Sequence, residues 1–166
     1  MTAVALQHEF PSNPIDLVED IAGKRNWLVD RAAQDEVNLI VAGSWCDLHI
    51  SLNWHEEMEG LHLACTFDLK VPRNRREEVS RVVSMINEQL FYGHFDLWRT
   101  EGVLLFRHSV LLTGGASITT AQCDGMLAMM LKNAEQFYPV FQFVIWAGKS
   151  AEEAMQASML ETEGEA

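Results

Sequence analysis

Apolar and polar positions alternate over two long stretches in the middle of the chain. In residues 46–54 and 61–71 every second side chain is apolar, and the positions between them are mostly polar. A period of two places one set of side chains on each face of a strand. A short polar loop at 55–60 joins the stretches. The pattern therefore predicts an antiparallel hairpin in which His62 lies opposite about Asn53.

Shorter alternating runs predict further strands. Residues 37–41 form one run, and residues 94–98 and 103–112 form a second hairpin around the turn Thr100-Glu101-Gly102. A further strand at residues 27–34 is left open.

Helical spacing and capping signals surround these strands. Asn13 and Pro14 predict the start of a first helix, and a stripe from Val79 to Leu90 predicts a second. Thr119 and Gln122 form a capping box for a third helix, which runs to about residue 136 and can continue past Pro139 with a kink. A last short helix is expected at 151–160.

This order predicts an α+β fold, an antiparallel sheet with helices packed on one face, in the order α-β-β-β-α-β-β-α. We expect an N-terminal lead-in at residues 1–13, a single domain at 14–150, and a short helix with an acidic tail at 151–166. No repeat or linker divides the domain.

Composition narrows the function classes. The 166 residues include 24 acidic and 12 basic side chains, which gives a net charge of −12. That charge repels phosphates, so neither nucleic acid nor an anionic membrane is an expected partner. The start of the chain lacks the basic residues of a secretory signal, and the three cysteines cannot all pair. Unpaired cysteines are typical of a reducing compartment, so a cytoplasmic location is expected.

The histidines and cysteines of the long hairpin form a mirrored pattern. Cys46 and His49, and then His62 and Cys65, have spacings seen in zinc sites. On a strand, however, residues three apart point to opposite faces, so the four side chains cannot converge. The chain also lacks the local motifs of nucleophilic catalysis and of phosphate binding. We therefore expect no catalytic residue, no metal site and no cofactor.

Two features favour protein binding instead. The third helix is apolar on more than one face, as if a second protein covered part of it. The side chains expected to form this dimer or partner surface are Met126, Met129, Met130, Phe137 and Phe141. The alternative is a central helix that its own chain covers.

The second feature is a basic cluster in an acidic chain. Arg73, Arg75, Arg76 and Arg81 lie at or near a helix start, where positive charge opposes the helix dipole. This position suggests an acidic partner, either within the fold or across an interface. The alternative is a solvated face whose charges are paired locally.

Several short motifs, in order along the chain, resemble the YbjN family of putative bacterial sensory transduction regulators. They are Trp54, Leu61-His62-Leu63, Phe67-Asp68, Val71-Pro72-Arg73, Arg75-Arg76-Glu77-Glu78-Val79, Ile86-Asn87-Glu88, Gly93-His94-Phe95, Phe106-Arg107, Tyr138-Pro139 and the end from Glu161 to Ala166. The resemblance implies a fold like that of type III secretion chaperones, which are small, acidic and often dimeric. It supplies no catalytic residue.

Together these observations predict a non-enzymatic, cytoplasmic protein-binding module, a chaperone-like adaptor or a regulator of bacterial signalling. Its expected partners are a second copy of itself, as a homodimer, and an unidentified protein. The alternative is a sensor domain that binds a small ligand in a cavity between sheet and helices. A small enzyme that uses His62, His94, His108 and a cysteine is the third possibility, and it requires those side chains to meet.

Overall fold

A computed structural model describes the backbone of residues 13–164 and the side chains of residues 13–160. Its elements are α1 (Pro14–Lys24), β1 (Leu28–Ala33), β2 (Glu36–Ala42), β3 (Asp47–His55), β4 (Gly60–Lys70), α2 (Arg76–Asn87), β5 (His94–Trp98), β6 (Val103–Leu111), α3 (Thr120–Ile145) and α4 (Ala151–Gly164). Residues 1–12 of the expected lead-in, and residues 165–166 of the expected acidic tail, lie outside the described residues.

All six strands belong to one antiparallel sheet with the order β1-β2-β3-β4-β6-β5. The predicted hairpin is confirmed in β3 and β4, and His62 does lie opposite Asn53. On one face of β3 the side chains of Leu48 and Leu52 are buried, while His49 on the other face is exposed. One face of the sheet therefore carries the core, and the other faces solvent.

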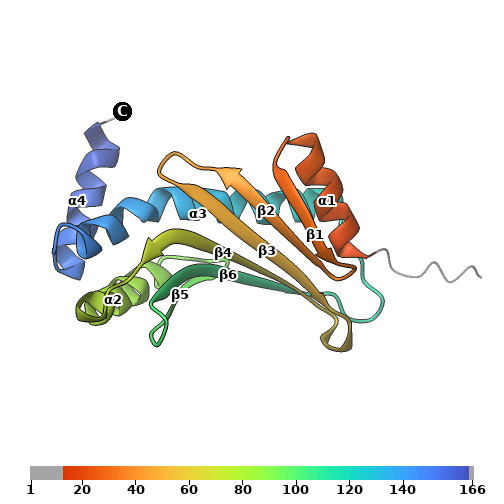
Figure 1. The fold of residues 1–166 in the computed structure, drawn as a ribbon, viewed down its shortest axis with the longest axis horizontal. Helices are drawn as coiled ribbons and strands as arrows, with labels where there is room; N and C mark the ends of the chain where they lie inside the picture. The colour runs from red at the N-terminus through yellow and green to blue at the C-terminus, as the bar shows by residue number, and fades with distance from the viewer. Residues whose placement is uncertain (1–12, 165–166) are drawn as a thin grey trace, which may run out of the picture.

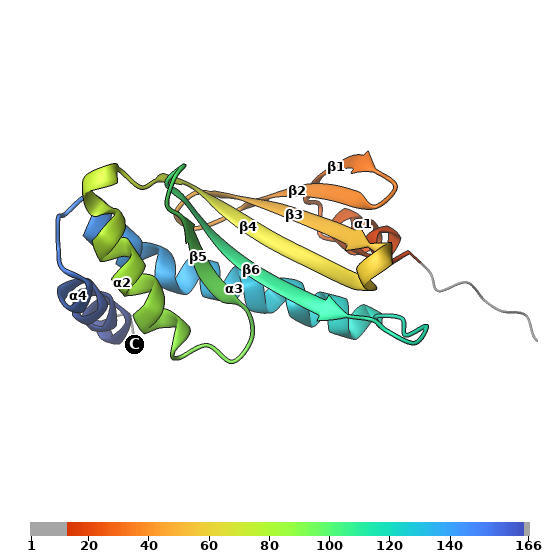
Figure 2. The ribbon, with the colours of Figure 1, turned by 90° about the horizontal axis from the view of Figure 1, so that it is seen from below.

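The helices pack on the apolar face, as predicted. Figure 1 shows α3 running behind the sheet along its length, and Figure 2 shows α1, α2 and α3 on the same side of the strands. The α+β class is confirmed. The structure has one strand more than the predicted order, because the stretch that the sequence left open forms β1.

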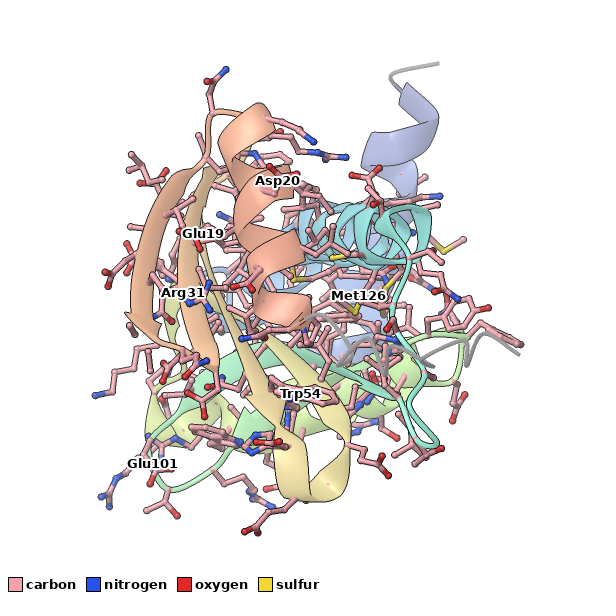
Figure 3. The ribbon with its side chains drawn as sticks, turned by 90° about the vertical axis from the view of Figure 1, so that its right-hand side faces the viewer. Glu19, Asp20, Arg31, Trp54, Glu101 and Met126 are labelled. Atoms are coloured by element: carbon pink, nitrogen blue, oxygen red, sulfur yellow. The ribbon has the colours of Figure 1, made fainter. Side chains whose placement is uncertain are left out.

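β1 is an edge strand with little burial. Five of its six side chains are exposed, so it has no alternating pattern to detect. It is held to α1 by Arg31, whose guanidinium donates to Glu19 at 2.7 Å and to Asp16 at 3.0 Å. Figure 3 shows Arg31 pointing toward Glu19 beneath the helix.

α3 begins at the predicted capping box, in which the Thr119 and Gln122 side chains each accept from the other residue's backbone N–H. The helix continues through Pro139 to Ile145. It contacts α1, α2 and α4, and its buried side chains join those of the sheet in one core cluster. The chain itself therefore covers several faces of this apolar helix.

α4 is attached to the rest of the fold through α2. The Glu78 carboxylate accepts from the backbone N–H of Ala151 at 2.9 Å, and Arg81 pairs with Glu152. Figure 2 shows the two helices side by side at one end of the molecule. Among the described helices, none combines the length and the apolarity that crossing a membrane requires.

Candidate functional site

Four of the five side chains expected on a partner surface lie in the core. Met126, Met130, Phe137 and Phe141 are at most 7% exposed, because the sheet and the neighbouring helices cover α3. This corrects the expectation that they form an exposed face. Met129 is half-buried, and it lines a groove together with the edge of Met126.

This groove, which we call the methionine groove, lies between α3, the end of β6 and the loop before β5. Its volume is about 620 Å³. Its lining is mostly apolar and includes Tyr92, His108, Val110, Leu111, Ile118, Gly125, Met126 and Met129. Gly125 opens the helix side of the groove, since nothing lies within 4 Å of the position that a Cβ would occupy. In Figure 3 the Met126 side chain lies among those beneath the start of α3.

Aromatic rings form the opposite wall. Tyr92 is edge-on to His108, with ring centroids 6.2 Å apart, and edge-on to Phe91 at 4.6 Å. Phe91 is 89% exposed and Leu111 is 69% exposed, so large apolar side chains surround the opening. Burial, together with the nearby His94, lowers the pKa of His108 below its usual value. This shift favours the neutral form of His108 in the wall.

A second hollow of about 560 Å³, the acidic cleft, continues from the methionine groove. The two share Leu112, Ala116 and Ser117 in the connection from β6 to α3. Three carboxylates line the acidic cleft, from Asp35, Glu56 and Glu59, and none of them forms an ion pair with a described residue. Trp54 also lines it and lies at the end of the sheet in Figure 3. The joined hollows therefore have an apolar half and a negative half.

The expected arginine patch is divided between different contacts. Arg75 donates to the backbone carbonyls of Val144 at 2.9 Å and Lys149 at 2.6 Å, and so holds the end of α3. Arg81 pairs with Glu78 and Glu152.

The other two members of that patch have different surroundings. Arg76 bonds to three backbone carbonyls, whereas Arg73 is exposed. Three of the four side chains therefore serve contacts within the chain, but only Arg81 pairs with carboxylates. Only Arg73 and Arg76 of the four share a surface pocket.

Within residues 13–160, the histidines named for a small enzyme lie on opposite faces of the sheet. His62 and His94 lie on the solvent face of the sheet, whereas His108 lies toward the helices. Arg107 donates to the Nε2 atom of His62 at 3.3 Å, and burial and this cation lower the pKa of that histidine. The described part of the chain holds no group of three potential metal ligands.

Two of the three thiols, those of Cys65 and Cys123, are poor nucleophiles because they are buried. Burial raises the pKa of Cys65 to about 12 and that of Cys123 to about 11. Both are therefore protonated at neutral pH, and a thiolate is the form that reacts. Neither thiol adjoins a histidine that could act as its base in any contact that the structure shows among residues 13–160.

The sequence interpretation did not identify Tyr92, Leu111 or the three carboxylates of the acidic cleft. A signal was present for the first, because Phe91 and Tyr92 stand together in a loop before Gly93. The carboxylates come from two separate turns, and only the fold brings them to the same hollow.

Comparisons with known proteins agree with this fold. The model of the family described as "YbjN: Putative bacterial sensory transduction regulator" matches residues 14–143, which lie within the domain expected at 14–150. A chain from the solved structure "Crystal Structure of the ExsC-ExsE Complex" is similar, with a TM-score of 0.56 and 19% identity over 76% of this chain and 93% of that chain. The expected fold, like that of type III secretion chaperones, is thereby confirmed.

A second solved structure, "Crystal structure of YbjN, a putative transcription regulator from E. coli", has a TM-score of 0.46 and 10% identity over 72% of this chain and 90% of that chain. No curated protein matches the chain.

Proposed function

Because the chain belongs to the YbjN family, we propose that it is a non-catalytic protein-binding module of a regulatory system. Its binding site is the methionine groove with the adjoining acidic cleft. The occupant is an amphipathic segment of a partner protein, whose apolar side chains enter the groove and whose basic side chains meet the cleft.

The groove is the observation that carries this proposal. Methionine side chains are flexible and polarizable, so the half-buried Met129 adapts to varied apolar side chains, whereas Met126 contributes only an edge. Tyr92 and Phe91 provide large, rigid contact areas with few rotatable bonds. An exposed apolar surface of this kind is typical of protein interaction sites.

The negative charge of the acidic cleft supports the proposal that the bound segment carries basic side chains. Asp35, Glu56 and Glu59 lie at one end of the joined hollows, and the residues that line the cleft include no basic side chain. A lysine or arginine of the segment would gain favourable electrostatic energy there and would orient the segment. The fold similarity to a chain from the ExsC–ExsE complex, a structure of two different proteins, adds support for protein binding.

The test fills the groove without disturbing the core. Gly125→Phe adds a Cβ where nothing lies within 4 Å and replaces a poor helix former, so the fold should keep its stability. Ala128→Phe, at an exposed position on α3 outside the groove, is the matched control. The probe is a fluorescein-labelled amphipathic peptide of leucine and lysine, measured by anisotropy.

We expect Gly125→Phe to weaken peptide binding about tenfold or more, since a filled pocket excludes the apolar side chains, whereas Ala128→Phe should bind like the wild type. Equal binding by both variants would contradict the proposal. The groove's volume also suits a small molecule, so an NMR titration with a pool of small metabolites tests the ligand-sensor alternative. If the pool shifts the Tyr92 and Met129 resonances while the peptide does not bind, that alternative is favoured.

We also propose that the protein works in the cytoplasm as a homodimeric adaptor or regulator. Cys65 and Cys123 are unpaired, which fits a reducing compartment. The dimer has no support from Met130 or Phe141, because the core already buries them. Sedimentation velocity at micromolar concentration tests it, and a single species of monomer mass would end that part of the proposal.

A further inference from the structure

The arginine side chains of this protein fall into two groups, those with partners outside a shared pocket and those that line this pocket together. The chain has eight of them, at positions 25, 31, 73, 75, 76, 81, 99 and 107. Those at 25, 31, 81 and 107 pair with carboxylates, and Arg75 binds backbone carbonyls. The other three, Arg73, Arg76 and Arg99, line one pocket of about 410 Å³ together with Glu77 and Thr100.

Arg76 is fixed at the base of this pocket. Its Nε atom donates to the carbonyl of Val71 at 3.2 Å, and its Nη1 atom donates to the carbonyls of Thr100, at 3.1 Å, and Arg99. These bonds join the end of β4, the start of α2 and the turn between β5 and β6. The guanidinium and the turn therefore hold each other in place before any ligand arrives.

Gly102 closes the turn against this guanidinium. Its φ is +73°, and a Cβ at this position would lie 2.6 Å from the Nη2 atom of Arg76. Its N–H donates to the carbonyl of Trp98 at 2.7 Å, and its own carbonyl accepts from Val71 at 2.9 Å. Several hydrogen bonds thus hold the backbone around the pocket.

Arg73 and Arg99 are exposed, and neither guanidinium has a hydrogen bond or an ion pair within the described part of the chain. Carboxylates outnumber basic side chains two to one, at 24 to 12, so unpaired arginines are not explained by a shortage of acids. Both free guanidiniums lie in the same pocket as the fixed one. Glu77 is the one carboxylate that lines it, against three positive charges.

We propose that this arginine pocket binds the carboxylates of a short acidic segment in a partner protein. A guanidinium binds a carboxylate with two parallel hydrogen bonds, and Arg73 and Arg99 have their donors available for this. The site is separate from the methionine groove and does not depend on the function proposed there. In Figure 1 the β5–β6 turn and α2 lie at one end of the molecule, and the β6–α3 connection lies at the other.

The net charge of −12 favours a short segment over a nucleic acid. A polyanion of regular charge would extend beyond the pocket and be repelled by the net negative charge of the chain. An acidic segment of a few residues meets the local positive charge within one screening length, which is about 8 Å at physiological salt.

The test is an NMR titration with a synthetic peptide that carries three glutamates, at low salt. The side-chain Nε–Hε signals of Arg73 and Arg99 and the Thr100 amide should shift and saturate. The double variant Arg73→Gln/Arg99→Gln should weaken binding about tenfold or more, because each charge-assisted bond contributes more than a neutral one. The methyl signals of Met126 and Met129 should not move, which separates this result from binding in the groove.

The matched control is Lys24→Gln/Lys132→Gln, which removes the same charge elsewhere on the surface. It should bind the peptide like the wild type. Equal weakening in the two double variants would mean that net charge alone acts, and would overturn the proposal. The proposal would also be overturned if the peptide caused no shifts. The same holds if inorganic phosphate or a single-stranded oligonucleotide bound these arginines as tightly as the peptide.

Discussion

The indole Nε1 of Trp45 donates a 3.2 Å hydrogen bond to the backbone carbonyl of Glu135, four residues before Pro139. In an uninterrupted α-helix the N–H at position 139 would bind that carbonyl, but proline has no N–H. The Glu135 side chain reaches back, and its Oε1 atom accepts from the N–H of Ser44 at 2.9 Å. The turn between β2 and β3 therefore compensates for the proline in α3 and is itself held by the helix.

We predict that Trp45→Phe lowers the free energy of unfolding by about 1 kcal/mol, because the Glu135 carbonyl loses its donor. The loss should be smaller in a Pro139→Ala background, where the backbone N–H returns. Urea denaturation of the four proteins forms a double-mutant cycle that isolates this coupling. The same cost of Trp45→Phe in both backgrounds would disprove the compensation.

Arg75→Met should lower stability by about 2–3 kcal/mol, because the carbonyls of Val144 and Lys149 lose a charged donor at the end of α3. Arg73→Met is the control two positions away, with an exposed side chain that has no partner in residues 13–160, and it should change stability by less than about 0.5 kcal/mol. Thermal and urea unfolding measure both variants. Similar losses would mean that Arg75 does not hold the helix end.

Gly93→Ala should cost about 2–4 kcal/mol, because φ is +69° and the added Cβ would lie 2.3 Å from the buried ring of Phe106. Gly114 has nearly the same φ, +68°, with nothing within 4 Å of its Cβ position. Gly114→Ala should therefore cost only the backbone strain, about 1 kcal/mol. Urea unfolding compares the two. Equal costs would argue against the close approach of Phe106.

The attachment of α4 should weaken in acid. The backbone N–H of Ala151 and the nearby Arg81 lower the pKa of Glu78. A carboxyl whose pKa is lowered by folding stabilises the fold above its unfolded value, about 4.3, and this contribution is lost as the pH falls through the folded value. The Ala151 amide shift, followed by NMR from about pH 7 to about pH 2.5, should report this titration.

Glu78→Gln should remove that titration from the Ala151 amide. Glu153→Gln is the control, since Glu153 accepts from the N–H of Ser150 instead. The Ala151 titration should persist in that variant. An unchanged titration in Glu78→Gln would show that another group detaches the helix.

Local patterns predicted much of this fold. The alternation around His49 and Cys65 gave the correct register, because a half-buried strand needs a period of two. Thr119 and Gln122 marked the start of α3, because a capping box satisfies backbone donors within three residues. Asn13 caps α1 for the same reason, accepting from the N–H of Ile15 at 3.0 Å.

The other features depend on contacts between distant residues. α3 is apolar on several faces because the sheet, α1, α2 and α4 all cover it, and sequence alone could not distinguish that cover from a second protein. Arg99 is separated from Arg76 by one helix and one strand, so only the fold places both in one pocket. β1 is exposed along its length, and an edge strand without a buried face has no periodic signal.

β6 connects the two proposed sites directly. The arginine pocket adjoins the turn before Val103, and the methionine groove is lined by His108, Val110 and Leu111 at the other end of the strand. A strand of nine residues is about 30 Å long at about 3.4 Å per residue. A single partner chain that reached from the pocket to His108 would therefore need about five extended residues, or about 11 helical ones, and one that reached to Leu111 would need about nine extended residues, or about 20 helical ones. The length of β6 thus sets the spacing between the two binding motifs in the sequence of any such partner.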